Sequence, residues 1–189
     1  MRMKSTILVD EMNVIGQLHR IGIEGFKPWS SFYKGIETFF GFYAEKHFYC
    51  SNVPKELEVR FQKRNIFFGG LKLGGIKVHE GFSIYDYRKR LVEKGVDVML
   101  GMDIYQFASD GVEDIVICSG DSDLVPAILR AKNHGARIHL VVSKSIPANT
   151  RILDAADQII QLEDILLCMP SEDIILKNSK KQKLIKEGA

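Results

Sequence analysis

The sequence of 189 residues is poor in the side chains from which disulfide-rich proteins and zinc sites are built. Its three cysteines, Cys50, Cys118 and Cys168, stand far apart, which excludes a compact disulfide set and a cysteine zinc site and favours reduced thiols. The five histidines never fall four residues apart, which argues against a histidine-based metal centre.

Long apolar runs and a strong net charge are missing as well. No stretch approaches the ~20 apolar residues that a membrane-spanning helix needs, and acidic residues break the apolar run in MRMKSTILVDEMN, unlike in a signal peptide. The net charge of +2 indicates no nucleic-acid partner by itself, so such a partner has to meet a local basic rim. We therefore expect a soluble cytoplasmic protein that does not bind membranes.

What the sequence does contain is an alternation of apolar strands and amphipathic helices. The patterns predict strands at 5–10, 46–52, 76–84, 114–118, 136–142 and 158–162. Helical spacing lies between them, at 29–43, from Pro54 to the glycine pairs 69–70 and 74–75, and at 96–108, 123–134, 150–156 and 163–169. This order predicts an α/β three-layer sandwich with a mainly parallel central sheet.

The division into domains follows from composition. At 46% hydrophobic residues, the chain has enough apolar side chains for one full core, which we expect within residues 1–168. The end of the chain, KNSKKQKLIKEGA, carries five lysines and little that a core would bury. We expect residues 169–189 to form a basic, flexible C-terminal tail.

Acidic residues gather where two of the expected strands end. Asp10 closes the strand 5–10, with Asn13 just beyond it, and SGDSD (119–123) follows the strand 114–118. Because ligands bind at the carboxyl ends of parallel strands, Asp10, Asp121 and Asp123 should emerge at one edge. Asp97 and Asp103 lie six residues apart on the preceding helix, about 600° of rotation, so at most one belongs in the innermost group.

Such a group of carboxylates needs a compensating charge. Two unit charges ~5 Å apart at an effective dielectric near 20 repel by roughly 3 kcal/mol. An oxygen-only set suits Mg²⁺ or Mn²⁺, either of which activates water and neutralises charge on a phosphate. The simpler alternative is helix capping by Asp121 or Ser122. Ser119 and Ser122 could contact a phosphate or a metal-bound water, but capping explains them more simply.

These residues resemble the NYN domain, a family of the PIN-like nuclease superfamily, in its LabA-like branch. The motifs are D-x-x-N (Asp10, Asn13), KGVDV (94–98) with Asp103 beyond it, and SGDSD (119–123). The flanks ICSGDSDLVPAILRAKNHGARIHLV (117–141) and LDAADQIIQLED (153–164) are also similar, so the resemblance covers roughly 5–164. The family often has Gly-Asn inside the first motif, where this chain has Glu11-Met12.

The resemblance implies a PIN-like fold and a Mg²⁺- or Mn²⁺-dependent ribonuclease that hydrolyses single-stranded RNA. It implies that Asp10, Asp97, Asp121 and Asp123 are catalytic and bind the metal, with Asp103 as an outer metal ligand. Asn13 would orient Asp10 or a substrate phosphate.

A purely acidic pocket repels RNA, so basic residues must surround it. The candidates flank Asp97 or follow the strand 136–142, and they are Arg88, Lys89, Arg90, Lys94 and Lys144. Tyr85 and Tyr87 lie among them and offer rings on which bases stack. An ordinary solvated surface is the alternative explanation of this cluster.

Two other functions stay open at this point. A non-catalytic member of the family would keep the fold and bind RNA or a protein partner as a regulator. A phospho-acceptor or phosphatase domain would use Asp10, Glu11 and Lys144, although SGDSD then goes unexplained. The aromatic-rich segment 26–49 also leaves a homodimer open, because it could pack against a second subunit as well as within one.

Overall fold

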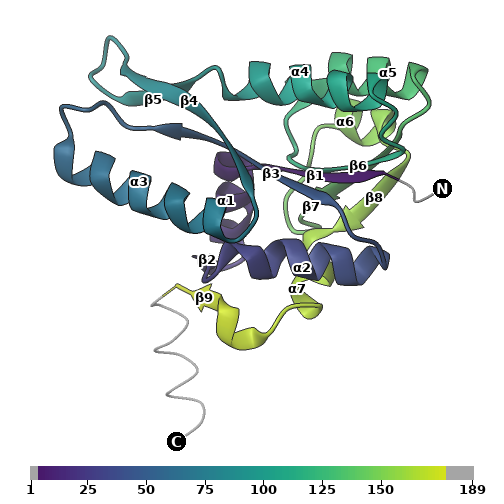
Figure 1. Ribbon diagram of the computed structural model, residues 1–189, viewed down its shortest axis with the longest axis horizontal. Coiled ribbons are helices and arrows are strands. Elements are labelled where there is room, and N and C mark those ends of the chain that lie inside the picture. The colour runs from purple at the N-terminus through teal and green to yellow at the C-terminus, as the bar shows by residue number, and fades with distance from the viewer. Residues whose placement is uncertain (1–3, 178–189) are drawn as a thin grey trace, which may run out of the picture.

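The strand β1 (Ser5–Asp10) runs through the middle of the molecule, and all six of its residues are buried. It belongs to a computed structural model that describes residues 4–177. Within these residues a seven-stranded sheet has the order β5-β4-β3-β1-β6-β7-β8, with helices on both faces (Figure 1). All neighbouring pairs are parallel except β4 with β5. The predicted three-layer sandwich with a mainly parallel sheet is confirmed.

The other strands of the large sheet are β3 (Glu45–Asn52), β4 (Lys77–Tyr85), β5 (Leu91–Lys94), β6 (Asp114–Cys118), β7 (Arg137–Val142) and β8 (Gln158–Gln161). A small antiparallel sheet pairs β2 (Ile23–Phe26) with β9 (Ile174–Leu176). The α-helices are α1 (Glu11–Arg20), α2 (Trp29–Phe40), α3 (Glu58–Leu73), α4 (Val96–Ser109), α5 (Val125–Asn133), α6 (Thr150–Ala155) and α7 (Leu162–Leu167).

The strand order places a switch point beside β1. From β1 the chain builds outward through β3 and β4 on one side, and later through β6, β7 and β8 on the other. The crossovers therefore diverge between β1 and β6, and the loops after these two strands open a crevice at the carboxyl edge. This is where the acidic motifs lie.

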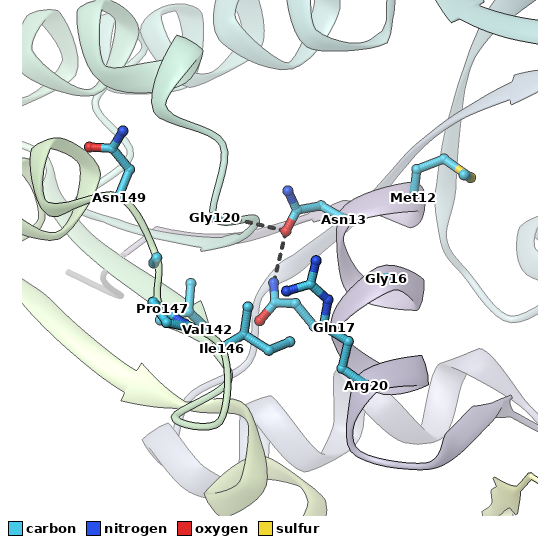
Figure 2. A pocket seen from close by; sticks show the side chains of 11 residues that line it. Met12, Asn13, Gly16, Gln17, Arg20, Gly120, Val142, Ile146, Pro147 and Asn149 are labelled. Carbon is cyan, nitrogen blue, oxygen red and sulfur yellow. Dashed lines mark hydrogen bonds between the residues drawn. The ribbon is translucent and has the colours of Figure 1, made fainter.

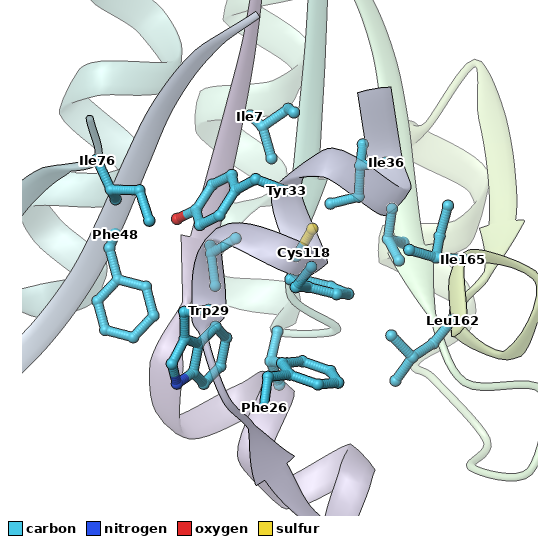
Figure 3. Close-up of a cluster of buried hydrophobic side chains, with 14 of the residues drawn as sticks. Ile7, Phe26, Trp29, Tyr33, Ile36, Phe48, Ile76, Cys118, Leu162 and Ile165 are labelled. Carbon is cyan, nitrogen blue, oxygen red and sulfur yellow. The ribbon is translucent and has the colours of Figure 1, made fainter. Parts of the chain in front are cut away.

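Two hydrophobic cores lie between the sheet and the helices, one on each face. Ile7 and Val9 of β1 pack with α1, α2, α3 and α7 on one face, whereas Leu8 packs with α4, α5 and α6 on the other. Figure 3 shows the first core, where the Trp29 ring meets Phe48 edge-on at 4.9 Å between centroids. By the same alternation Asp10 faces the α4 side, as Leu8 does. The free cysteines Cys50 and Cys118 are buried, as expected of reduced core thiols.

The aromatic stripe predicted at 29–43 is mostly core. Trp29, Phe32, Tyr33 and Ile36 are buried within this chain. The helix ends at Phe40, because Gly41 takes a left-handed φ of 72°, and Tyr43 beyond it is 78% exposed. The segment therefore needs no second subunit to bury its rings, and a homodimer stays untested.

Several expectations need correction. The segment 11–20 received no predicted element but forms α1, and β2, β5 and β9 were also missed. The tail was predicted to begin at 169, yet Met169 is buried and β9 pairs with β2, so the folded part reaches Leu176. The rest of the predicted tail, 178–189, lies outside the described residues. No helix among residues 4–177 combines the length and the apolar character that crossing a bilayer requires.

Candidate functional site

Asp10 is the buried centre of the acidic edge. As the last residue of β1 and the N-cap of α1, it accepts a hydrogen bond from the backbone N–H of Asn13 at 3.1 Å. Its second oxygen accepts one from Ser119 Oγ at 3.0 Å. Burial raises the pKa of Asp10 to about 6, against these two hydrogen bonds, and the charges of Asp97 and Glu93 raise it further.

The SGDSD loop is fastened to the start of α1. Ser119, fully buried, donates to Asp10 and accepts from the backbone N–H of Asp121 at 3.2 Å. The backbone N–H of Gly120 donates to Asn13 Oδ1 at 2.9 Å, as Figure 2 shows. These bonds join β1 and β6 at their carboxyl ends. Ser119 and Asn13 therefore hold the acidic loop in place.

Asp121 is the N-cap of a short 3₁₀ helix, Ser122–Leu124, that leads into α5. Its Oδ1 accepts from the backbone N–H of Asp123 at 2.9 Å, and its Oδ2 has no hydrogen-bond partner within residues 4–177. The capping explanation and the site explanation are thus compatible, because one oxygen caps and the other is available. The cap is Asp121 and not Ser122, which is half-buried beside it.

Asp97 connects the two halves of the acidic edge. It lies in the first turn of α4, two residues after Gly95, whose left-handed φ of 83° turns the chain from β5 into the helix. Burial raises the pKa of Asp97, and the charges of Asp121 and Asp123 raise it further. Asp97 in turn raises the pKa of Asp10. Asp97 is therefore the acid that links Asp10 electrostatically to the SGDSD loop.

A fifth carboxylate, Glu93, was missed from the sequence. It lies on β5, the antiparallel edge strand, and one of its side-chain oxygens is buried without a hydrogen-bond partner in the described chain. Burial raises the pKa of Glu93, and the charges of Glu11 and Asp97 add to this. LVEK shows no alternation of apolar and polar residues and lies in a basic segment, so the sequence pattern did not predict this strand.

Glu11 and Asp103 do not belong to this group. Glu11 pairs with Arg64 through two hydrogen bonds of 2.6 Å, so its charge is already compensated. Asp103 accepts from Tyr49 Oη at 2.8 Å and lies 3.3 Å from His79 Nδ1. Asp97 and Asp103 have different neighbours, as expected from their spacing on the helix, and the role of Asp103 as an outer metal ligand stays a prediction.

The predicted basic residues are only partly available. Arg90 donates to Asp86 in the same turn at 2.9 and 3.0 Å, so its charge is locally paired. Lys94 is exposed at the end of β5, two residues before α4 begins, and Lys144 is exposed after β7. Arg130, which was not predicted, borders the same surface depression as Asp97 and Asp123.

The turn between β4 and β5 projects beyond the acidic edge. Asp10, Tyr49 and His79 lie in one row across β1, β3 and β4. Tyr85 is six residues past His79, and at ~3.3 Å per residue the hairpin extends roughly 20 Å beyond that row. Tyr87 at its tip is 85% exposed, with the Arg88 guanidinium 5.1 Å from the ring centroid. The aromatic and basic residues thus share an exposed arm.

The comparison with known families can now be added to this geometry. The sequence matches the family model of the NYN domain over residues 32–163, well over half of the chain. This chain belongs to the NYN domain family, within the PIN-like nuclease superfamily. The match includes Asp97, Asp121 and Asp123 of this NYN domain but begins after Asp10. The LabA-like branch stays a prediction.

A solved structure with a similar fold is that of a protein of unknown function from Vibrio parahaemolyticus. It is 17% identical to this NYN domain, with a TM-score of 0.66, and the alignment covers 87% of this chain and 95% of that chain. At this identity the likeness shows the fold. A search of curated proteins found no match.

The acids at the edge have the oxygen ligands that a hard divalent cation prefers, but they are not arranged as a complete metal site. The acids at the edge are all carboxylates, and their mutual repulsion is what a cation would relieve. Within residues 4–177, however, no three His, Cys, Asp or Glu side chains are close enough to form a ready-made metal cage. The all-carboxylate chemistry suits Mg²⁺, which keeps several waters and binds through one or two carboxylates, better than Zn²⁺.

Proposed function

We propose that this NYN domain is a Mg²⁺- or Mn²⁺-dependent ribonuclease that hydrolyses phosphodiester bonds of single-stranded RNA. One observation carries the proposal. Asp10, Asp97, Asp121 and Asp123 come from three separate segments at the switch point of the sheet, and within residues 4–177 none of them forms an ion pair. The charge of Asp97 raises the pKa of Asp10, and the charges of Asp121 and Asp123 raise the pKa of Asp97. Like charges are gathered in this way where a cation or a reacting group offsets them.

The division of labour follows from exposure. Asp10 is buried and fixed by two hydrogen bonds, so it offers a rigid anchor for one side of the cation. Asp97 is exposed, and Asp121 Oδ2 has no hydrogen-bond partner within residues 4–177, so both would complete the ligand set together with water. A bound cation would supply the nucleophile by acidifying a water and would neutralise charge on the phosphate. Glu93, whose pKa is raised, can hold a proton close to these acids.

Binding of the RNA strand would rely on the outer end of the β4–β5 hairpin and on two basic side chains outside that end. Tyr85 and Tyr87 offer stacking surfaces, and Arg88 and Lys89 at the tip offer positive charge to the backbone. Lys94 and Arg130 lie closer to the acids, where they would offset the repulsion between carboxylates and phosphates. Arg90 contributes less, because Asp86 already pairs with it.

The decisive experiment incubates a labelled single-stranded RNA with the protein and Mg²⁺ or Mn²⁺. Asp97→Asn and Asp121→Asn should each reduce cleavage by about 100-fold or more, because each removes a negative charge that holds the cation. Asp110→Asn is the matched control, since Asp110 ends α4 away from the edge and accepts only from Gln106 among the described residues. Cleavage that survives in both test variants would identify a contaminating nuclease.

A second candidate function is a non-catalytic NYN domain that binds RNA or a protein partner. The absence of a ready-made three-ligand group within residues 4–177 favours it. The two functions separate in one assay, because a non-catalytic domain retains RNA in a gel-shift experiment with Mn²⁺ present and leaves the strand intact. Intact RNA from wild-type protein under all divalent ions would establish this alternative and refute hydrolysis.

A further inference from the structure

A cavity of about 370 Å³ adjoins the acidic edge on its β7 side. It lies between α1 and the loop that connects β7 to α6 (Figure 2). Two of its lining residues are directly connected to the acids. The backbone N–H of Asn13 donates to Asp10, and Gly120 directly precedes Asp121. A ligand in this cavity would therefore be a direct neighbour of the carboxylates. Its volume is near the lower end of the ~300–1,000 Å³ range of small-molecule sites.

The polar lining of the cavity includes the side-chain amides of Asn13 and Gln17. Gln17 is buried and bonded at both ends of its amide, because it donates to Asn13 Oδ1 at 2.8 Å and accepts from the backbone N–H of Ser143 at 2.6 Å. Asn13 Oδ1 thus accepts two N–H groups, from Gln17 and Gly120, which fixes the orientation of the amide. The NH₂ group of Asn13 has no hydrogen-bond partner in the part of the chain that is described.

Arg20 is an exposed residue that adds a positive charge to the lining of the cavity. Arg20 follows Asn13 by seven residues and Gly16 by four, so all three lie on one face of α1 (Figure 2). No hydrogen bond or ion pair engages its guanidinium among residues 4–177, whereas Arg64 and Arg90 are both paired with carboxylates. A guanidinium of this kind matches the geometry of a phosphate group.

The remaining walls are apolar or bare. Gly16 leaves the surface of α1 open, since a Cβ built there would meet no atom within 4 Å. Ile146 and Pro147 form part of the opposite wall. A flat ring can be accommodated between a bare helix surface and apolar side chains, while a neighbouring cation binds a charged group attached to that ring.

We propose that this cavity binds one nucleotide of the substrate strand, with the phosphate on Arg20 and the base between Gly16 and Pro147. The Asn13 NH₂ group donates to an oxygen of the same nucleotide. The identity of the ligand as part of an RNA strand rests on the proposed function, whereas binding of a nucleotide does not. The cavity would then fix which phosphodiester of the strand faces the acids.

The test titrates uridine 5′-monophosphate and adenosine 5′-monophosphate into isotope-labelled protein in EDTA, so that no metal and no hydrolysis are involved. Amide chemical shifts of Asn13, Gly16 and Gly120 should change with one common dissociation constant. Gly16→Leu, which fills the cavity and favours the helix, and Arg20→Gln should each weaken binding at least about tenfold. Inorganic phosphate alone should bind more weakly and depend on Arg20 only.

Two matched variants serve as controls. Gly69→Leu makes the same change on α3, at a glycine that likewise has open space around it. Lys63→Gln removes one positive charge from an exposed position of α3. Both should bind the mononucleotides like the wild type. Equal binding by Gly16→Leu and wild-type protein, or shift changes confined to other surfaces, would overturn the proposal.

The outcome is separable from that of the hydrolase assay. Mononucleotide binding at the cavity without RNA cleavage would support the nucleotide site and refute the nuclease. Metal-dependent cleavage with an unchanged KM in Gly16→Leu and Arg20→Gln would refute the nucleotide site and leave the nuclease standing.

Discussion

Asp10 and Asp114 are two buried aspartates at opposite ends of neighbouring strands, and they are compensated in opposite ways. Asp10, at the carboxyl end of β1, has a hydroxyl and a backbone N–H as partners and other acids as neighbours. Asp114, at the amino end of β6, accepts from Arg137 at 2.9 and 3.0 Å and from His139 at 2.8 Å. At the amino end of these strands the aspartate charge is neutralised by basic side chains, whereas at the carboxyl end the aspartate has no basic partner among the described residues.

The pKa values follow this difference. Burial raises the pKa of Asp10 to about 6. Burial also acts to raise the pKa of Asp114, but the hydrogen bonds from Arg137 and His139 hold it below its ordinary value. The comparison indicates that Asp114 serves stability, whereas the charge of Asp10 opposes folding and is retained for another purpose. The following predictions test this contrast, from the largest expected effect to the smallest.

Replacing each aspartate by asparagine should change stability in opposite directions. Asp114→Asn should lower the free energy of unfolding at pH 7.5 by about 1–3 kcal/mol, because the charged acceptor is lost. Asp10→Asn should raise it by about 1 kcal/mol, because the amide still accepts from Asn13 without the cost of a buried charge. Urea denaturation followed by circular dichroism measures both values. A strong loss of stability in Asp10→Asn would show that its charge is compensated after all.

The pH dependence of these variants has a defined sign. Since the pKa of folded Asp10 is raised, its ionisation lowers stability as pH rises from about 4 to about 6. Asp114 acts in the opposite sense, because its pKa is lowered and its contribution is lost as pH falls below its ordinary value of 3.8. The stability gained by Asp10→Asn should therefore disappear at pH 4.

Divalent ions should stabilise the acidic end and leave the neutralised end unaffected. At ten times its dissociation constant, Mg²⁺ should add about 1.4 kcal/mol and raise Tm by about 3–5 °C at pH 7.5. The shift should shrink at pH 5, where Asp10 is protonated, and should be lost in Asp97→Asn. Asp114→Asn should keep it. Differential scanning calorimetry with and without Mg²⁺ measures the change in Tm. An equal change in Asp97→Asn and wild-type protein would show that the ion binds elsewhere.

Ser119→Ala should have the smallest effect and the most specific one. It removes the hydroxyl that donates to Asp10 and accepts from the Asp121 backbone, at a cost of about 1 kcal/mol. Because this hydrogen bond favours the charged carboxylate, its loss should raise the pKa of Asp10 above about 6. NMR titration of the Asp10 carboxyl carbon measures the value. Ser122→Ala is the matched control and should leave the pKa unchanged, since Ser122 does not bond Asp10.

The sequence alone was sufficient for the layers of the fold and for the position of the acidic motifs at one edge of the sheet. Continuous apolar runs such as 114–118 and the helical stripe at 29–36 are local patterns, and strand ends carry Asp10, Asp121 and Asp123 to one edge in any parallel sheet. The family motifs added Asp97. These features depend on residues close in the chain or on a general rule of parallel sheets.

The tertiary structure alone decided which polar groups are compensated. Glu11 is paired with Arg64, which is 53 residues away, and Asp103 with Tyr49, which is 54 residues away. Glu93 joined the site because β5 turns back along β4, and the Arg20 cavity depends on a loop that begins beyond residue 142. A carboxylate's charge state depends on what packs within a few ångströms of it, and periodicity along the chain carries no record of those distant partners.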